Sequence, residues 1–189
     1  MIAAEPRTSA PWYVSLDLEF NQPSQRIIQL GAVLGDMRTG QRISRLSVFV
    51  NPEEPLAPEI ANLCGIAPGV LETAGSLEEA HAQLCAWLAP FRESRRVNPL
   101  TWGGADSETL RLSLGLPCNE HWLFGRRWLD VKTVFTAFQD ARDLPATGGL
   151  ATSMKKVGLF FEGRKHDAAD DAWNTFRMYH RLVSLSRPG

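Results

Sequence analysis

The stretch Trp12–Phe20, WYVSLDLEF, alternates like a β-strand and carries two acids near its end. Because side chains in a strand alternate faces, Asp17 and Glu19 share one side, while Leu18 and Phe20 share the other. At a rise of about 3.3 Å per residue the two carboxylates stand roughly 6–7 Å apart. Like charges this close raise each other's proton affinity unless a cation lies between them, and such oxygen ligands suit Mg²⁺ or Mn²⁺. A solvated acidic end of an edge strand would give the same letters, so this pattern alone leaves both interpretations open.

Two more strands are expected directly after this one. Residues 26–34 (RIIQLGAVL) form a nearly continuous apolar run, and residues 41–50 (QRISRLSVFV) alternate. The segment between them, DMRTG at 36–40, is typical of a hairpin connection. Three consecutive strands with short links predict an antiparallel meander.

The rest of the chain alternates between strand and helix patterns. Ser76, with Glu79 three residues later, predicts a helix start through a capping box. Beyond it, strands are expected at 96–102 and 127–131, and helices at 107–114, 132–141, 148–157 and 168–184. Alternating strands and helices favour crossover connections. The prediction is therefore an α/β fold with a mixed five-stranded sheet and helices on both faces.

A second acid lies where a strand pattern meets a helix pattern, in LTWGGADSETL at residues 100–110. Two glycines after Trp102 allow a sharp turn, and Asp106 follows at or just before the expected helix. An aspartate at this place is typical of a helix N-cap. Ligands also gather at such junctions in sheets flanked by helices, and both interpretations stand on this segment.

The third acidic stretch is GRKHDAADDAWNTF at residues 163–176. Helical spacing places Asp171 in a stripe that should face the sheet. A carboxylate in such a stripe is costly unless it is paired or binds a cation. His166 precedes the expected helix, so a loop could aim its imidazole at whatever Asp171 binds. Asp167 and Asp170 are expected to point into solvent.

The chain has 189 residues, enough for one domain with a sizeable core, which we expect at 12–185 after a flexible tail at 1–11. Its formal net charge of −1 does not indicate an overall basic surface for binding nucleic acid. A local basic rim around a metal cluster could still hold a strand end. No apolar run is long enough to span a bilayer and no signal-peptide pattern stands at the start, so we expect a cytoplasmic protein without a membrane partner.

Together these motifs resemble the DEDDh branch of the DnaQ-like 3′–5′ exonucleases over about residues 12–185. The resemblance rests on D-x-E in the first strand, an aspartate at the mid-chain strand-to-helix junction and H-x4-D at the last helix. Within that branch the chain is most similar to the ERI-type RNA exonucleases, through RIIQLGAV, NPEEPLAPEIANLCGI and GRKHDAADDAWNT. Two departures bear on nucleotide and sugar preference. Phe20-Asn21 follow Glu19 where many members have a small hydroxyl residue or alanine, and Cys64 replaces a common threonine. The resemblance implies a ribonuclease H-like fold.

The resemblance also implies a role for each site residue. Asp17, Glu19, Asp106 and Asp171 would bind two divalent metal ions, Mg²⁺ or Mn²⁺, with Asp17 as the bridging ligand. Two such ions can stabilise both the attacking and the leaving oxygen of an in-line displacement at phosphorus. His166 would be the general base that deprotonates the attacking water. The products would be nucleoside 5′-monophosphates.

Contacts to the substrate are expected from residues near these motifs. Leu63 and Ile66 are candidates to contact the terminal base or ribose, although an apolar helix end packing into the core predicts the same letters. Trp102 could stack on a base, and Arg164 and Lys165 could contact phosphates. The alternatives are a buried tryptophan and a solvated basic face. The full set of candidate contacts is Phe20, Leu63, Ile66, Trp102, Arg164 and Lys165.

Three functional classes follow from this sequence. We favour a metal-dependent 3′–5′ exonuclease that acts on single-stranded RNA or short oligonucleotides, with RNA preferred over DNA. A DNA-trimming or proofreading exonuclease would use the same chemistry and, since the sequence lacks a polymerase region, would need a partner chain. A non-catalytic nucleic-acid-binding module is the third class, and the intact set of four acids with His166 argues against it.

Overall fold

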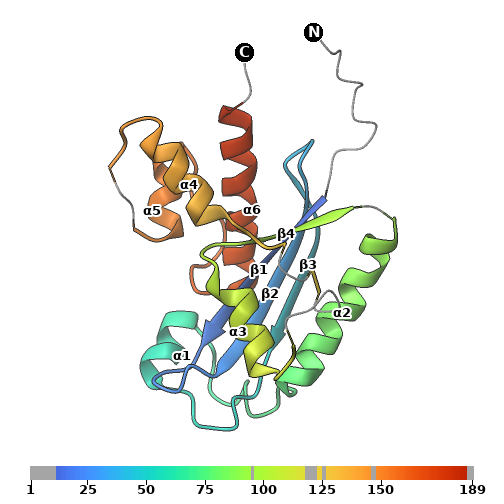
Figure 1. Cartoon of the computed structure of the whole chain (residues 1–189). Coiled ribbons are helices and arrows are strands. Elements are labelled where there is room, and N and C mark those ends of the chain that lie inside the picture. Colours follow the sequence, from blue (N-terminus) through green and yellow to red (C-terminus); the bar gives the residue numbers. More distant parts are fainter. Residues whose placement is uncertain (1–11, 95, 118–122, 125–126, 146–147, 187–189) are drawn as a thin grey trace.

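The computed structural model describes residues 12–94, 96–117, 123–124, 127–145 and 148–186. Its centre is a five-stranded sheet with the strand order β3-β2-β1-β4-β5 (Figure 1). Three strands pair antiparallel, and two further strands lie parallel to the first. They are β1 (Trp12–Phe20), β2 (Ile27–Asp36), β3 (Gln41–Phe49), β4 (Val97–Thr101) and β5 (Leu129–Asp130). The expected meander and mixed sheet are confirmed, while the tail expected at 1–11 lies outside the described residues.

Helices cover both faces of the sheet, as expected (Figure 1). The long helix α6 packs on β1 and β2, with α4 and α5 against it, and α2 packs on β2 and β3. The helices are α1 (Pro58–Cys64), α2 (Leu77–Ser94), α3 (Ala105–Ser113), α4 (Val131–Asp140), α5 (Leu150–Lys156) and α6 (Ala168–Leu185). The Glu79 N–H donates to the Ser76 hydroxyl and the Ser76 N–H donates to the Glu79 carboxylate, which together form the predicted capping box of α2. Among the described helices, none combines the length and apolarity needed to cross a membrane.

The elements differ from the sequence prediction mainly at their ends. Strand β5 has only two residues in place of the expected 127–131, and α3 begins at Ala105 rather than at 107. The earlier start of α3 matters for the site, because it places Asp106 inside the first helical turn. The apolar residues of β1 and β2 fill the core on the α2 side, where Leu16, Leu30 and Leu84 are buried together.

Two glycines of β2 let α6 lie directly on the sheet. A Cβ atom at Gly31 would overlap the backbone of Ala168, and one at Gly35 would overlap the ring of Phe176. Gly31 pairs with Asp17 across β1 and β2. The absence of a side chain at Gly31 therefore brings the first turn of α6 close to the acidic end of β1.

Candidate active site

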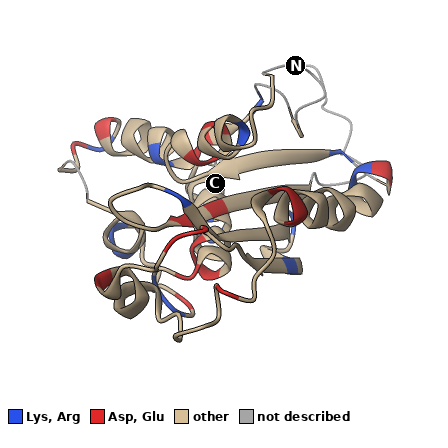
Figure 2. Cartoon of the chain, turned by 90° about the horizontal axis from the view of Figure 1, so that it is seen from below, with Lys and Arg blue, Asp and Glu red and all other residues tan. Residues whose placement is uncertain are grey.

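The candidate site lies at the end of β1, where the first turns of α3 and α6 converge on it. β1 supplies Asp17 and Glu19 on the face that α6 covers, and the register between β1 and β2 shifts just after Glu19. α3 supplies Asp106 and α6 supplies Asp171, each in its first turn. Irregular strand ends of this kind are frequent beside active sites, where they change the direction of a side chain. Figure 2 shows acidic segments near the centre of the view from below, with basic ones spread around them.

The electrostatics show that the four acids occupy one site. Burial raises the pKa of Asp17 well above its usual value, and the charges of Asp106, Asp171 and Glu19 raise it further. Burial followed by the charge of Asp171 raises the pKa of Glu19 to about 7. Burial raises the pKa of Asp171 to about 6, although a hydrogen bond from the His166 amide acts in the opposite direction. Buried carboxylates this close to one another favour either protons or cations.

Asp106 does not cap its helix. The N-cap of α3 is Gly104, and no side-chain capping bond is formed there. Burial, followed by the charge of Asp130, raises the pKa of Asp106 to about 7. Of the two interpretations that the sequence left open for Asp106, the N-cap is wrong, and the role as a site residue stays a prediction.

Asp130 is a residue that the sequence did not single out. It caps α4, accepting hydrogen bonds from the N–H of Lys132 at 2.8 Å and the hydroxyl of Thr133 at 2.6 Å. Its Oδ1 also accepts the N–H of Gly103 at 2.8 Å. Asp130 thereby fixes the turn that leads into α3 and Asp106. The signal that could have revealed it is an aspartate directly before a helical pattern.

His166 lies in the loop before α6, as expected, with its backbone in the left-handed region at φ 62°. Its N–H donates a 2.7 Å hydrogen bond to Oδ2 of Asp171. One ligand atom from each of Glu19, His166 and Asp171 lies within 4.8 Å of the others. Non-glycine residues held at positive φ are often found at functional sites. The loop thus brings an exposed imidazole to the acids of β1 and α6.

The first turn of α6 is anchored to the sheet by contacts that the sequence did not predict. Asp167, expected in solvent, is the N-cap of α6 and accepts the N–H groups of Ala169 and Asp170. Gln29 of β2 donates to Asp167 at 3.1 Å, and its side-chain oxygen accepts the N–H of Ala168 at 3.2 Å. Arg45 of β3 forms an ion pair with Asp167 at 2.9 Å. Asp167 is therefore structural, and the expectation of a solvated side chain is wrong.

Asp170, also expected in solvent, holds the loop that carries His166. Its Oδ2 accepts the N–H of Arg164 at 2.8 Å, and its Oδ1 lies 3.5 Å from the guanidinium of Arg45. The expectation of a solvated side chain is therefore wrong for Asp170 too. The chain folds back along α6, and its backbone and Arg45 bind this carboxylate.

Cys64, at the end of α1, is in contact with the site. Its Sγ donates to Oε2 of Glu19 at 3.6 Å. Burial, followed by the charge of Glu19, raises the pKa of the thiol to about 12. The thiol therefore remains protonated and acts as a hydrogen-bond donor that orients the Glu19 carboxylate.

The apolar substrate candidates divide into exposed and buried residues. Leu63 on α1 is 48% exposed, whereas Ile66 is only 5% exposed and packs with the α1 core. Phe20 packs against the core on the α2 side of the sheet. Trp102 is half-buried, with its ring 6.3 Å from that of Phe135. Leu63 is the most exposed of these four side chains, and its contact with a nucleotide stays a prediction.

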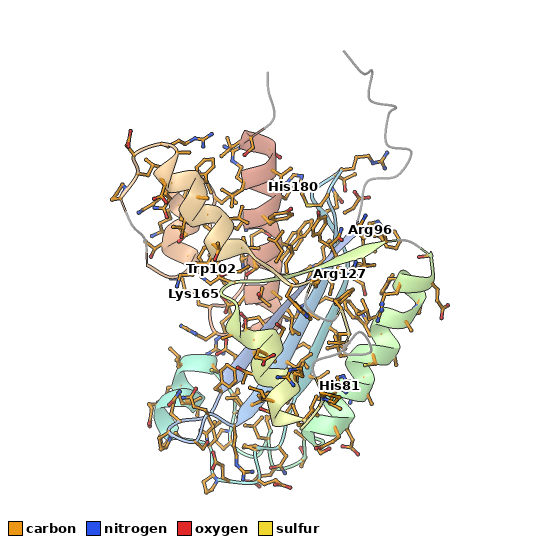
Figure 3. The ribbon with its side chains drawn as sticks, in the orientation of Figure 1. His81, Arg96, Trp102, Arg127, Lys165 and His180 are labelled. Carbon is orange, nitrogen blue, oxygen red and sulfur yellow. The ribbon has the colours of Figure 1, made fainter. Side chains whose placement is uncertain are left out.

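The two basic candidates are both exposed in the loop before His166. The Arg164 side chain crosses Gly65, where a Cβ would overlap its guanidinium, and donates to the carbonyl of Asn62 at 3.4 Å. Figure 3 shows Lys165 and Trp102 on the same side of the view, beside the lower half of α6, with His81 and His180 away from them. Arg164 thus joins the loop before α6 to α1.

The donor set fits hard divalent cations. Four carboxylates supply the oxygen ligands that Mg²⁺ and Mn²⁺ prefer. Burial and like charge raise the pKa values of all four acids, which is the condition that a bound cation relieves. The residues present therefore suit a divalent metal centre.

A family model described as "RNase_T: Exonuclease" matches residues 14–179. Among curated proteins, the chain is similar to ERI1 exoribonuclease 2 of Homo sapiens, with 27% identity over 183 residues. That match covers 85% of this chain but 26% of the human protein. The chain therefore spans about a quarter of the length of this relative.

Solved structures with the same fold agree with this match. The nuclease domain of 3′hExo, described as a DEDDh family member bound to rAMP, has a TM-score of 0.77 and 18% identity, covering 95% of this chain and 94% of that one. S. pombe Pop2p in a form bound to Mg²⁺ and Mn²⁺ has a TM-score of 0.67 and 18% identity, covering 92% of this chain and 83% of that one. These structural likenesses support the ribonuclease H-like fold expected from the sequence.

Proposed function

Because this chain belongs to the RNase_T family of DEDDh 3′–5′ exonucleases, which are hydrolases, we propose that it shortens single-stranded RNA or short oligonucleotides from the 3′ end. The products are nucleoside 5′-monophosphates. The observation that carries this proposal is the convergence of four acids from β1, α3 and α6, with the His166 imidazole beside two of them.

The metal ligands in this proposal are Asp17, Glu19, Asp106 and Asp171. When bound, two divalent cations supply Lewis-acid stabilisation of the oxygens that carry charge during displacement at phosphorus. Mg²⁺ and Mn²⁺ are the proposed ions, in agreement with the oxygen ligands and with the form described for Pop2p. The Cys64 thiol keeps the Glu19 carboxylate oriented.

His166 is the general base in this proposal. Its imidazole accepts a proton from water as the water oxygen forms a bond to the terminal phosphorus. The bond between phosphorus and the 3′ oxygen of the preceding nucleotide breaks, and that oxygen takes a proton from solvent water to become the new 3′-hydroxyl. Histidine suits this work because an unperturbed imidazole exchanges its proton near neutral pH. The hydrogen bond from the His166 N–H to the Asp171 carboxylate fixes the position of the residue.

RNA is the proposed polymer because the relatives point to it. The human relative is named an exoribonuclease, and the 3′hExo domain is described as bound to rAMP. DNA trimming would use the same acids and the same base. The distinction depends on contacts to the 2′-hydroxyl and is decided by experiment.

The test is a time course with 5′-labelled single-stranded RNA and DNA of matched sequence, each with a free or a blocked 3′ end. The full chain is incubated with Mg²⁺ or Mn²⁺, beside an EDTA sample and the Asp171→Asn variant. We expect a ladder that shortens from the free 3′ end, faster on RNA, and that disappears with EDTA and in the variant. Shortening of blocked strands, or a ladder that persists in the variant, would overturn the assignment.

A further inference from the structure

The chain between α5 and α6 is bound along the length of α6. We call Val157–Arg164 the α5–α6 segment. Four side chains on one face of α6 hold its backbone, at spacings of four, three and four residues, which lie on one face of a helix. The bonds are Arg181 Nε to the Val157 carbonyl at 3.0 Å, Arg177 to the Phe160 carbonyl at 2.8 Å, Asn174 to the Glu162 carbonyl at 2.7 Å, and the Arg164 N–H to Asp170 at 2.8 Å. This backbone is therefore fixed before any ligand binds.

Side chains of the α5–α6 segment alternate between the core and the solvent. Leu159 and Phe161 pack against the core cluster of α4, α5 and α6. Phe160 lies between them and is 79% exposed. Its two apolar neighbours are turned inward, so the exposed ring does not belong to a larger apolar patch formed by this segment. A phenylalanine ring that stays exposed on a fixed backbone forgoes the favourable free energy of burial. The ring is therefore available to contact a ligand.

The position of Phe160 connects it with the catalytic loop. It stands six residues before His166 in the chain, a distance of at most about 20 Å at full extension. Arg164 and Lys165 lie between the two, and both are exposed. An aromatic face, two cations and the imidazole therefore follow one another along the same stretch of chain.

We propose that Phe160 is a stacking site for a base of the single strand, upstream of the 3′ nucleotide that is removed. The inference rests on the proposed function. Aromatic rings bind single strands with little sequence preference because every base has a π-face, and nearby cations bind the phosphates. A single ring suits a base better than it suits a protein surface, since protein contacts use contiguous apolar patches. Because the backbone is already fixed, binding does not lose the conformational entropy that a mobile loop would lose.

The experiment compares kcat/KM on a ten-nucleotide single strand with kcat/KM on a dinucleotide, because only the longer substrate reaches an upstream site. The variants are Phe160→Ala, Phe160→Trp and the control Leu112→Ala, which removes an exposed apolar side chain, 61% exposed, from α3. We expect the ratio of long to short substrate to fall about tenfold in Phe160→Ala. Phe160→Trp should keep the ratio, and Leu112→Ala should leave it unchanged.

The outcomes separate this inference from the proposed function. If the wild type shortens both substrates and Phe160→Ala keeps the wild-type ratio, the stacking site is overturned while the exonuclease stands, and a protein-contact role for the ring would be favoured. An equal fall in Phe160→Trp would also overturn it, since the loss would then come from a disturbed segment. If the wild type shortens neither substrate, the proposed function is wrong, and the stacking site that rests on it is overturned as well.

Discussion

The main-chain N–H of His166 donates to Oδ2 of Asp171 at 2.7 Å, so the proposed base is held by one of the proposed metal ligands. His166 adopts φ 62°, a conformation that the loop must maintain at some cost. Asp171 thus anchors the loop as well as taking part in the acidic cluster. Asparagine keeps an acceptor at this position, which makes Asp171→Asn a sharper test of charge than alanine.

Removal of one buried charge should stabilise the metal-free protein. Asp17 is the acid whose pKa is raised by burial and by four neighbouring carboxylates. Asp17→Asn is expected to raise the melting temperature in EDTA, because it removes the charge that its neighbours repel. The same variant should lose all detectable nuclease activity with Mn²⁺. Calorimetry and the strand-shortening assay test both parts, and a lower melting temperature in EDTA would contradict the electrostatic account.

His166→Ala should separate proton transfer from metal binding. We expect kcat to fall about 10²- to 10⁴-fold, the usual contribution of a general base. Binding of Mn²⁺, followed by titration calorimetry, should remain close to that of the wild type if the four acids are the ligands. Because a ligand atom of His166 also lies near Glu19 and Asp171, a large loss of Mn²⁺ affinity would reassign the imidazole as a metal ligand.

The stability of the metal-free protein should fall as the pH rises. The pKa is about 7 for Glu19 and Asp106 and about 6 for Asp171 in the folded chain, above their values near 4 in an unfolded chain. Between about pH 4 and 7 the folded state therefore binds more protons than the unfolded state, so the free energy of unfolding decreases with rising pH. Thermal melts in EDTA at pH 5 and pH 8 measure this.

Two additions connect that pH effect to the site. Glu19→Gln should narrow the difference between the melting temperatures at pH 5 and pH 8, because one of the titrating groups is gone. Mn²⁺ should raise the melting temperature more at pH 8 than at pH 5, since protons compete with the cation for the same oxygens. A wild-type protein that melts higher at pH 8 than at pH 5 in EDTA would refute the prediction.

Gly31→Ala should weaken both the fold and the activity. An added Cβ would overlap the backbone of Ala168, so α6 must move away from β2 and take Asp171 with it. Overpacking of this kind costs about 1–3 kcal/mol of the free energy of unfolding, measurable by urea denaturation. Gly149→Ala is the matched control, because no atom lies within 4 Å of its added Cβ. Equal stability of the two variants would rule out the close approach of β2 and α6.

Asp130→Asn should lower the pH at which activity with Mn²⁺ reaches half its maximum. The carboxylate holds the Gly103 N–H and its charge raises the pKa of Asp106. Asparagine keeps one acceptor oxygen but removes the charge, so the pH at which activity reaches half its maximum should shift downward as Asp106 releases its proton more easily. Asp140→Asn, at the far end of α4, is the control. An unchanged pH profile would limit Asp130 to capping the helix.

The sequence predicted the features that depend on local patterns. Alternation identified β1 and the shared face of Asp17 and Glu19, and helical spacing placed Asp171 toward the sheet. The position of His166 followed from its place just before a helix. These patterns depend on neighbouring residues within a few turns or strand pairs, which is the range over which periodicity carries information.

Contacts between distant residues could not be predicted in this way. Gln29 meets Asp167 although 138 residues separate them, and Cys64 reaches Glu19 from a different element. Periodicity tells which face a residue occupies but not which residue it meets there. The mistaken solvent positions of Asp167 and Asp170 have the same origin, because their partners Arg45 and Arg164 come from β3 and from the returning loop.

The bonds along α6 have a consequence for how a product could leave. Because four side chains of α6 hold the α5–α6 segment, the loop with His166 and the helix with Asp171 move as one piece. In the described part of the chain, a 3.4 Å hydrogen bond from Arg164 to the Asn62 carbonyl joins this loop to α1. A product that left between α1 and this loop would have to break that bond, while His166 and Asp171 would keep their relative positions.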